Sequence, residues 1–259
     1  MLSGYKLRSR GLGGRDSGVG LREGDDQPVG WCQLDGRSTY VLHLERGEWK
    51  VVHVHWSVAK PNVEFLGRAL TTSLEELERS VQRERPDLSS TLAADGTVTI
   101  VFTDIVDSTV MLSRLGDQAW LDVLRTHNAV IAAATTADGG TVVETQGDGS
   151  MLAFSSARQG VACAIAIQRE IQLAFDDSLP IRVRIGVHTG DALQDEDHFY
   201  GTTVHYAARV ASQAREGEVL VSGVVRELLS GSGIALMEAR EAELKGLDGS
   251  HRLSAVDLS

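Results

Sequence analysis

Apolar and polar residues change period repeatedly from residue 97 to residue 257. Short runs rich in β-branched residues predict strands, whereas apolar residues that recur every three or four positions predict helices. The predicted strands are 97–102, 141–144, 150–154, 181–189, 219–221 and 251–256. The predicted helices are 108–115, 119–136, 157–175, 204–214 and 224–230. This order predicts an α/β sandwich with a ferredoxin-like core over residues 97–257.

The chain before this zone follows a different pattern. Residues 1–30 are rich in Gly, Arg and Asp and predict a poorly ordered tail. Within residues 31–60, a strand over 38–44 and a strand over 48–56 are joined by a tight turn. Bulky side chains occur on both faces of the second strand, as in a strand that is packed on two sides. This segment is therefore expected to be a small β-rich unit.

Residues 61–96 form a predicted linker that contains one helix. The sequence Ser73-Leu74-Glu75-Glu76 is a capping box, and Pro86 follows the expected end of the helix, so the helix should span 74–85. Leu74, Leu77 and Val81 have heptad spacing. The helix could therefore pair with its copy across a dimer or pack on its own domain, and one heptad does not decide between them.

Composition narrows the class of protein. The formal net charge of −11 argues against a nucleic-acid binder. No apolar run is long enough to cross a membrane, and no apolar stretch follows the basic N-terminus as in a secretory signal. Cys32 and Cys163 lie in unrelated contexts, and the apolar run around Cys163 predicts a buried thiol. Such cysteine usage indicates a reducing compartment, so a cytoplasmic protein without a membrane partner is expected.

Two acidic residues are candidates for metal chemistry. Asp104 ends the first strand of the α/β zone, and Asp148 lies at the tip of a predicted hairpin. A strand end beside a hairpin tip can bring two carboxylates to within metal-bridging distance, as phosphoryl transfer requires. The turn 105–109 opens a helix whose backbone N–H groups would suit phosphate oxygens. Equally, Asp104 could only cap that helix and Asp148 could only stabilise a turn.

Five motifs in order make the zone resemble a class III nucleotidyl cyclase catalytic domain, most closely the bacterial short-arm type. They are 102–109 (Phe-Thr-Asp-Ile-Val-Asp-Ser-Thr), 146–149 (Gln-Gly-Asp-Gly), 186–190 (Gly-Val-His-Thr-Gly), 201–209 and 243–247 (Glu-Leu-Lys-Gly-Leu). The resemblance covers the whole of 97–257. It implies a head-to-tail homodimer with two composite sites that act on ATP or GTP.

The resemblance also implies roles for individual residues. Asp104 and Asp148 would hold two Mg²⁺ or Mn²⁺ ions. Arg209 would stabilise charge on the α-phosphoryl group, and Lys245 would bind the terminal phosphates. The substrate phosphates would also meet the turn that carries Ile105, Val106, Ser108 and Thr109.

Three positions depart from the adenylyl cyclase pattern. Glu144 stands where that pattern has Lys, and a carboxylate there is the guanylyl cyclase choice. His198 stands where the pattern has Asp, Thr or Ser, and it matches neither base specificity. His205 replaces an Asn that works beside Arg209 in the transition state. His188, in contrast, is interpreted as a packing residue.

These features leave three functional hypotheses. The first is a weak cyclase that forms 3′,5′-cyclic AMP and pyrophosphate from ATP, with GTP as the alternative substrate because of Glu144. The second is a catalytically inactive cyclase-homology module for signalling. The third treats residues 31–60 as a small-ligand sensor that regulates the cyclase through the linker helix. Residues 47–58 in this segment resemble the closing strands of a SnoaL-like domain of the NTF2 superfamily, which would be truncated here. His53 and His55 share one face there, but two histidines without a third ligand do not indicate a metal site.

Overall fold

The structure, a computed structural model, describes residues 70–84, 86, 88, 91–175, 178–192 and 201–258, together with the backbone of four strands between residues 18 and 58. The chain divides into two compact units, Met1–Leu66 and Gly67–Ser259. The predicted base-reading residue His198 lies outside the described residues. No helix in the described part of the chain has the length and apolar character that crossing a membrane requires.

The first unit contains two antiparallel strand pairs. Strands β3 (Gly36–Glu45) and β4 (Glu48–Val58) form the predicted hairpin, whose register runs from Gly36 opposite Val58 to Glu45 opposite Glu48. Strands β1 (Gly18–Arg22) and β2 (Pro28–Gln33) also pair, so the tail predicted over residues 1–30 contains a strand that its composition did not indicate. The SnoaL-like resemblance stays a prediction.

The second unit is built on one seven-stranded sheet with the order β10-β11-β9-β8-β5-β7-β6. Its strands are β5 (Thr97–Ile105), β6 (Thr141–Gln146), β7 (Gly149–Phe154), β8 (Val183–Asp191), β9 (Val219–Ser222), β10 (Arg240–Glu243) and β11 (Ser250–Ala255). All neighbouring pairs are antiparallel except β8 and β9, which are parallel. This architecture confirms the predicted α/β sandwich.

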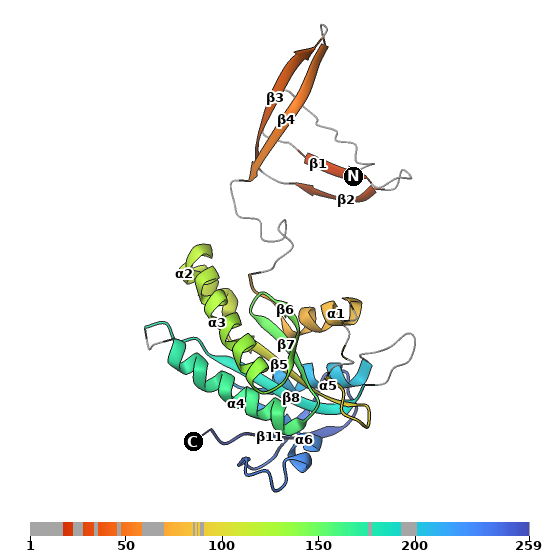
Figure 1. The fold of residues 1–259 in the computed structure, drawn as a ribbon, viewed down its shortest axis with the longest axis vertical. Coiled ribbons are helices and arrows are strands. Elements are labelled where there is room, and N and C mark those ends of the chain that lie inside the picture. Colours follow the sequence, from red (N-terminus) through yellow and green to blue (C-terminus); the bar gives the residue numbers. More distant parts are fainter. Residues whose placement is uncertain are drawn as a thin grey trace. The chain divides into compact units, whose positions relative to one another are not determined.

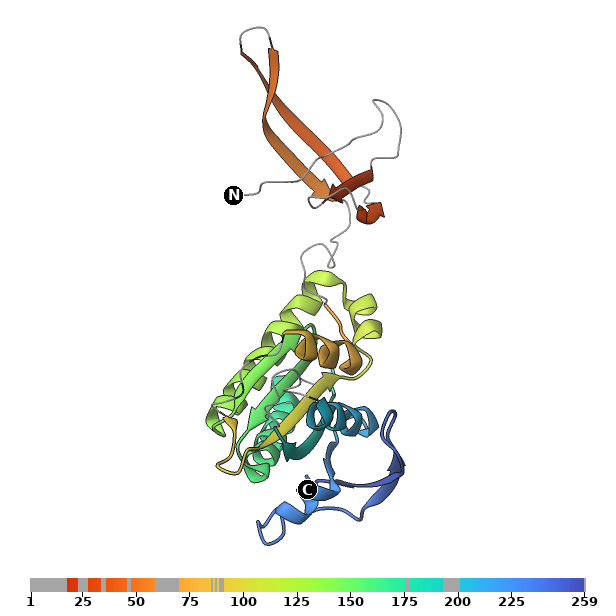
Figure 2. The same cartoon turned by 90° about the vertical axis from the view of Figure 1, so that its right-hand side faces the viewer.

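Helices cover both faces of this sheet (Figures 1 and 2). On one face lie α2 (Ser108–Leu115), α3 (Asp117–Ala137), α4 (Ala157–Ala174) and α6 (Gly223–Leu228). On the other face lie α1 (Leu74–Glu84) and α5 (Gly201–Gln213). Side chains of β5 point alternately to the two faces of the sheet. Val101 belongs to the core cluster on the α3 and α4 side, whereas Ile100 and Phe102 belong to the cluster on the α1 and α5 side.

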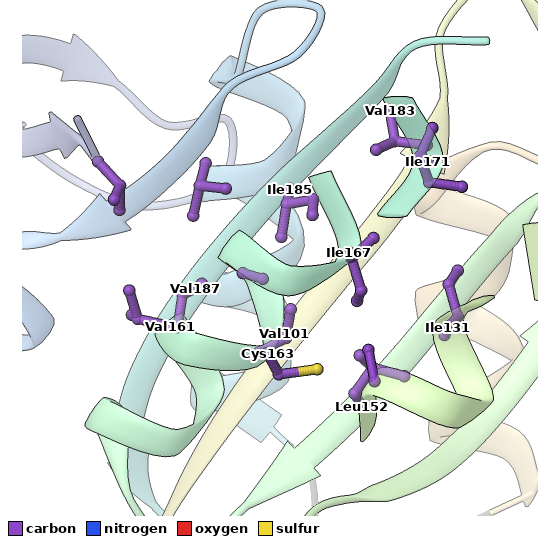
Figure 3. Close-up of a cluster of buried hydrophobic side chains, with 14 of the residues drawn as sticks. Val101, Ile131, Leu152, Val161, Cys163, Ile167, Ile171, Val183, Ile185 and Val187 are labelled. Carbon is purple, nitrogen blue, oxygen red and sulfur yellow. The ribbon is translucent and has the colours of Figure 1, made fainter. Parts of the chain in front are cut away.

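The larger core cluster lies between the sheet and the pair α3 and α4. Figure 3 shows Ile131 of α3 and Ile167 of α4 in this cluster, which also contains Leu152 and Ile185 of the sheet. Cys163 of α4 belongs to the same cluster and has no exposed surface, and burial raises the pKa of its thiol to about 12. The thiol is therefore buried and protonated, as its apolar surroundings predicted.

Helix α1 packs on its own unit. Leu74, Leu77 and Val81 are fully buried and join the core cluster that contains Phe102 and Met151. Of the two alternatives that the heptad spacing left open, the structure shows packing on the same domain. The capping box is formed as predicted, because Glu76 N donates to Ser73 Oγ at 3.2 Å and Ser73 N donates to Glu76 Oε2 at 3.1 Å.

Several element boundaries differ from the sequence prediction. Strand β5 continues through Asp104 to Ile105, because β8 pairs with it along its whole length. Strand β10 was not predicted: its sequence Arg-Glu-Ala-Glu carries no apolar alternation, and pairing with β11 stabilises it. Helix α5 begins at Gly201, three residues before the predicted start.

Candidate active site

Asp104 lies in β5 on the sheet face that α1 and α5 cover. Its side chain is almost completely buried, and its strand neighbour is Arg184 of β8. Arg184 donates from Nη2 and Nε to Asp104 Oδ2, at 2.6 and 3.1 Å. Asp104 Oδ1 is buried without a hydrogen-bond partner among the described residues. One oxygen of this carboxyl group is therefore held, and the other is left for a ligand.

Asp148 lies in the two-residue turn between β6 and β7, where Gly147 has a φ of 58°. The side chain is fully buried. Its Oδ1 accepts a hydrogen bond of 2.7 Å from the backbone N–H of Thr72. Its Oδ2 has no hydrogen-bond partner within the described part of the chain. The hairpin tip thus presents a second carboxyl group with one unpaired buried oxygen.

The two carboxyl groups influence each other. Burial, together with the nearby charge of Asp104, raises the pKa of Asp148 to about 7. Burial also raises the pKa of Asp104, although the guanidinium of Arg184 opposes this rise. The topology has therefore brought together the two acidic residues that the sequence singled out, in a buried setting where two negative charges are unfavourable.

This setting fits a divalent cation. Hard cations such as Mg²⁺ take oxygen ligands, often from one or two carboxylates together with substrate phosphates. Asp104 Oδ1 and Asp148 Oδ2 are buried oxygens that lack partners among the residues described, and a cation would satisfy both. Among the described residues no group of three or more His, Cys, Asp and Glu side chains is arranged to hold a metal ion by itself.

The turn that follows Asp104 differs in part from its predicted role. The N–H of Val106 donates to the carbonyl oxygen of Arg182 at 2.9 Å, so it is not free for phosphate as expected. Asp107 has a φ of 56°, in the left-handed region that non-glycine residues rarely adopt. Ser108 is buried at the start of α2, and its hydroxyl lies near enough to lower the pKa of Asp148 without a well-formed bond to Oδ2. Thr109 is exposed.

Arg209 and His205 lie one turn apart on α5, and both contact α1. Arg209 donates from Nη1 to Glu75 Oε1 and from Nη2 to Glu78 Oε2, each at 2.9 Å. His205 Nδ1 lies 2.7 Å from Glu78 Oε1. Arg209 and Glu78 are both buried, whereas 42% of the Glu75 side chain is exposed. These are contacts within one chain that sequence reasoning did not anticipate.

Lys245 lies in the turn between β10 and β11, where it is exposed. Its positive charge contributes to the lowered pKa of Glu75, for which a backbone hydrogen bond is the largest cause. The next residue, Gly246, has a φ of 82°, and a Cβ there would lie 3.1 Å from His205 Nε2. The turn therefore sits beside His205, and the three cationic or donor residues Lys245, His205 and Arg209 share one neighbourhood.

Glu144 is half-buried on β6, the edge strand. Burial raises the pKa of its carboxyl group, and the charge of Glu84 at the end of α1 raises it further. His188, interpreted as a packing residue, is buried on β8, with its ring stacked on Tyr206 at 4.0 Å and its Nδ1 2.8 Å from Ser222 Oγ. Burial lowers its pKa to about 4, so it is neutral near pH 7.

Arg184, Thr72, Glu75 and Glu78 all contact candidate site residues and were missed from the sequence. A signal existed for Arg184, because a charged residue within a buried apolar strand requires a partner. Glu75 and Glu78 resembled the solvated face of an amphipathic helix, and only the packing of α1 on α5 shows their partners.

The fold and this arrangement define an α/β sandwich domain with a buried carboxylate pair and a cluster of cationic side chains. Residues 92–255 match the adenylate and guanylate cyclase catalytic domain. Because the match spans more than half of the chain, the protein belongs to this family.

Individual relatives agree with this family. An uncharacterized protein of Mycobacterium tuberculosis is 32% identical over 143 residues, which is 55% of this chain and 48% of that protein. An adenylate cyclase of Glutamicibacter nicotianae is 29% identical over 140 residues, 54% of this chain and 34% of that enzyme. The chain thus spans about half the length of the M. tuberculosis protein and about a third of the G. nicotianae enzyme.

Solved structures share the fold. The guanylate cyclase domain of a Catenaria anguillulae protein, in complex with GTP, is 25% identical with a TM-score of 0.55, and the match covers 62% of this chain and 96% of that one. The adenylyl cyclase CyaB of P. aeruginosa is 21% identical with a TM-score of 0.55, and the match covers 62% of this chain and 93% of that one.

Proposed function

We propose that this protein is a nucleotidyl cyclase that converts ATP to 3′,5′-cyclic AMP and pyrophosphate. The observation that carries the proposal is the pair Asp104 and Asp148, each of which presents one buried oxygen without a partner among the described residues. Membership of the cyclase family and the adenylate cyclases among its relatives support ATP as the main substrate.

Asp104 and Asp148 would hold two divalent cations, Mg²⁺ or Mn²⁺. When bound, such cations activate the ribose 3′-hydroxyl and neutralise the triphosphate. Arg184 keeps Asp104 in position through its two hydrogen bonds to Oδ2. Thr72 N does the same for Asp148 Oδ1. Each carboxyl group is thereby held through one oxygen, and its other oxygen, which has no partner among the described residues, would bind a cation in a preorganised site.

The cationic residues would serve the phosphates. Arg209 would donate to oxygens of the α-phosphoryl group as charge develops during in-line attack by the 3′-oxygen, while pyrophosphate leaves. Lys245, which is exposed, would bind the terminal phosphates. His205 would donate a ring N–H beside Arg209. These residues would act on substrate held by the carboxylates of a second copy of the chain, in a head-to-tail homodimer.

GTP is the second candidate substrate, because of Glu144. A carboxylate can accept hydrogen bonds from guanine N1–H and the 2-amino group, whereas adenine N1 offers no proton. Burial and the charge of Glu84 raise the pKa of Glu144, so its charge is less favourable there than in water and a hydrogen-bond donor such as guanine would offset that cost. The GTP-bound structural relative from C. anguillulae also supports this candidate.

The test is a cyclase assay of the purified full chain with ATP and with GTP, in Mg²⁺ and in Mn²⁺. Asp104→Ala and Asp148→Ala should each abolish cyclic nucleotide formation while the protein stays folded. Asp122→Ala, which removes an exposed carboxylate of α3, is the matched control and should leave activity unchanged. Activity within about tenfold of wild type in either site variant contradicts the two-cation assignment. A folded wild-type protein without activity under every condition favours the inactive signalling module instead.

A further inference from the structure

Residues 72–78, which we call the acidic turn, run from the hairpin carboxylate to the cationic residues of α5. At its first residue, Thr72 N donates to Asp148 Oδ1 at 2.7 Å. The preceding backbone is also attached, because Trp120 Nε1 donates to the carbonyl oxygen of Leu70 at 2.7 Å. The buried residues Leu74 and Leu77 fix the turn to the sheet. Its position is therefore determined by packing as well as by polar contacts.

Carboxylates of the acidic turn accept hydrogen bonds from side chains of α5. Glu75 and Glu78 each take one terminal nitrogen of Arg209, and Glu78 also takes His205 Nδ1. Both Arg209 and Glu78 are withdrawn from solvent in this arrangement. The two carboxylates take one N–H from each terminal nitrogen of Arg209, and burial of the side chain keeps its other N–H groups, including the unpaired Nε–H, away from a phosphate.

The electrostatic reach of the turn is wider than its contacts. The charge of Lys245 acts on Glu75, and the charge of Glu75 raises the pKa of Asp104. The charge of Glu75 therefore acts both on Asp104, which is proposed to hold a cation, and on the cationic groups that are proposed to hold phosphates. At the other end of α1, Glu84 acts in the same way on Glu144. Asp104, Glu144, Arg209, His205 and Lys245 thus each have a carboxylate of α1 in contact or within electrostatic range.

We propose that the acidic turn inhibits the cyclase, because its carboxylates bind Arg209 and His205 in place of the substrate phosphates. The site then stays blocked until α1 moves away from α5. This inference rests on the proposed function of Arg209 and His205. Carboxylate oxygens of Glu75 and Glu78 occupy the donors that phosphate oxygens require, so nucleotide and turn compete for them. Displacement of α1 is then the step that activates the enzyme.

Glutamine substitutions test the competition, because they remove charge but preserve side-chain volume. In the full chain, Glu75→Gln combined with Glu78→Gln should raise kcat/KM about tenfold, as expected when a competing ground state is weakened. Glu76→Gln is the matched control: it removes the same charge from the same turn, keeps a residue that can form the capping box, and has no contact with Arg209 among the described residues. If the double variant does not fold, Glu75→Gln alone provides the test, because its position is more exposed. It should raise kcat/KM by a smaller factor, since Glu78 still holds Arg209.

A binding measurement separates this inference from the proposed function. A fluorescent ATP analogue in Mn²⁺ should bind the double variant about tenfold more tightly than wild type, whether or not turnover occurs. Tighter binding without cyclase activity in any variant would leave the acidic turn as a competitor and reject the enzyme. Folded variants that match the wild type in both kcat/KM and analogue affinity would overturn the inference, and the contacts of Glu75 and Glu78 would then be structural only.

Discussion

At the scale of one residue, the carboxyl group of Asp148, which is proposed to bind a cation, lowers the folding stability of the metal-free protein. In an unfolded chain its carboxyl group ionises near the ordinary pKa of 3.8, whereas burial and the neighbouring Asp104 raise the folded pKa to about 7. The folded protein therefore disfavours the charged form. Without a metal, this residue makes folding progressively less favourable as the pH rises from about 4 through about 7. A cation would remove this cost, which agrees with a site built for metal.

Replacing Asp148 with Asn should therefore stabilise the metal-free protein. Asn removes the charge but keeps an oxygen that can accept from Thr72 N. At pH 8 the free energy of unfolding should rise by up to about 4 kcal/mol, and at pH 5 by roughly 1 to 2 kcal/mol, because at pH 5 the folded carboxyl group is neutral while that of the unfolded chain is ionised. Denaturant titrations with EDTA at both pH values measure this difference. Equal effects at pH 5 and pH 8, or a loss of stability at pH 8, would contradict the buried charge; the exposed Asp122→Asn provides the baseline.

At the scale of elements, the position of α5 depends on close contact with β8. Gly186 of β8 lies directly beneath Ala211 of α5: a Cβ at Gly186 would lie 2.1 Å from the Ala211 nitrogen. This contact is between backbones, so no side-chain rotation relieves it. The glycine in the motif 186–190 is thus required for close helix packing, and α5 carries both His205 and Arg209.

Gly186→Ala should consequently displace α5 from the sheet. Overpacking of this kind costs about 1 to 3 kcal/mol, and the displaced Arg209 and His205 should lower cyclase activity by more than about tenfold. Thermal unfolding and the cyclase assay check both effects. Gly223→Ala serves as control, because a Cβ there meets only an ordinary contact of 3.4 Å with the Arg252 carbonyl oxygen. If Gly186→Ala retained full stability and activity, the tight β8–α5 contact would not position these residues.

At the scale of the whole molecule, the proposed mechanism requires two chains. The carboxylates of one protomer would act with Arg209 and Lys245 of another, so each variant that loses one half keeps the other. Asp104→Ala and Arg209→Ala should each be inactive alone, whereas their mixture should recover about a quarter of wild-type activity when subunits exchange at random, since half of the dimers then hold one intact site out of two. Differently tagged subunits, purified in sequence, establish that mixed dimers are present. An inactive mixture of proven heterodimers would contradict the head-to-tail arrangement.

Local sequence signals determined much of this fold. The β-branched runs placed β5 and β8, a short apolar run placed β7, and the capping box placed the start of α1, because strands, caps and tight turns depend on neighbouring residues. The same locality placed Asp104 at a strand end and Asp148 in a hairpin turn. The sequence by itself also indicated the cyclase family, through five motifs whose order lies along the chain.

Only the tertiary structure decided which charged groups meet. Arg184 pairs with Asp104 across 80 positions, and Glu75 and Glu78 reach Arg209 across 134 and 131. The same is true of β10, which carries no apolar pattern and forms through its pairing with β11. Charged side chains on an amphipathic helix look alike in sequence, whether solvent or a guanidinium faces them. Their partners depend on which surfaces the sheet order brings together, and that is a property of the packed molecule.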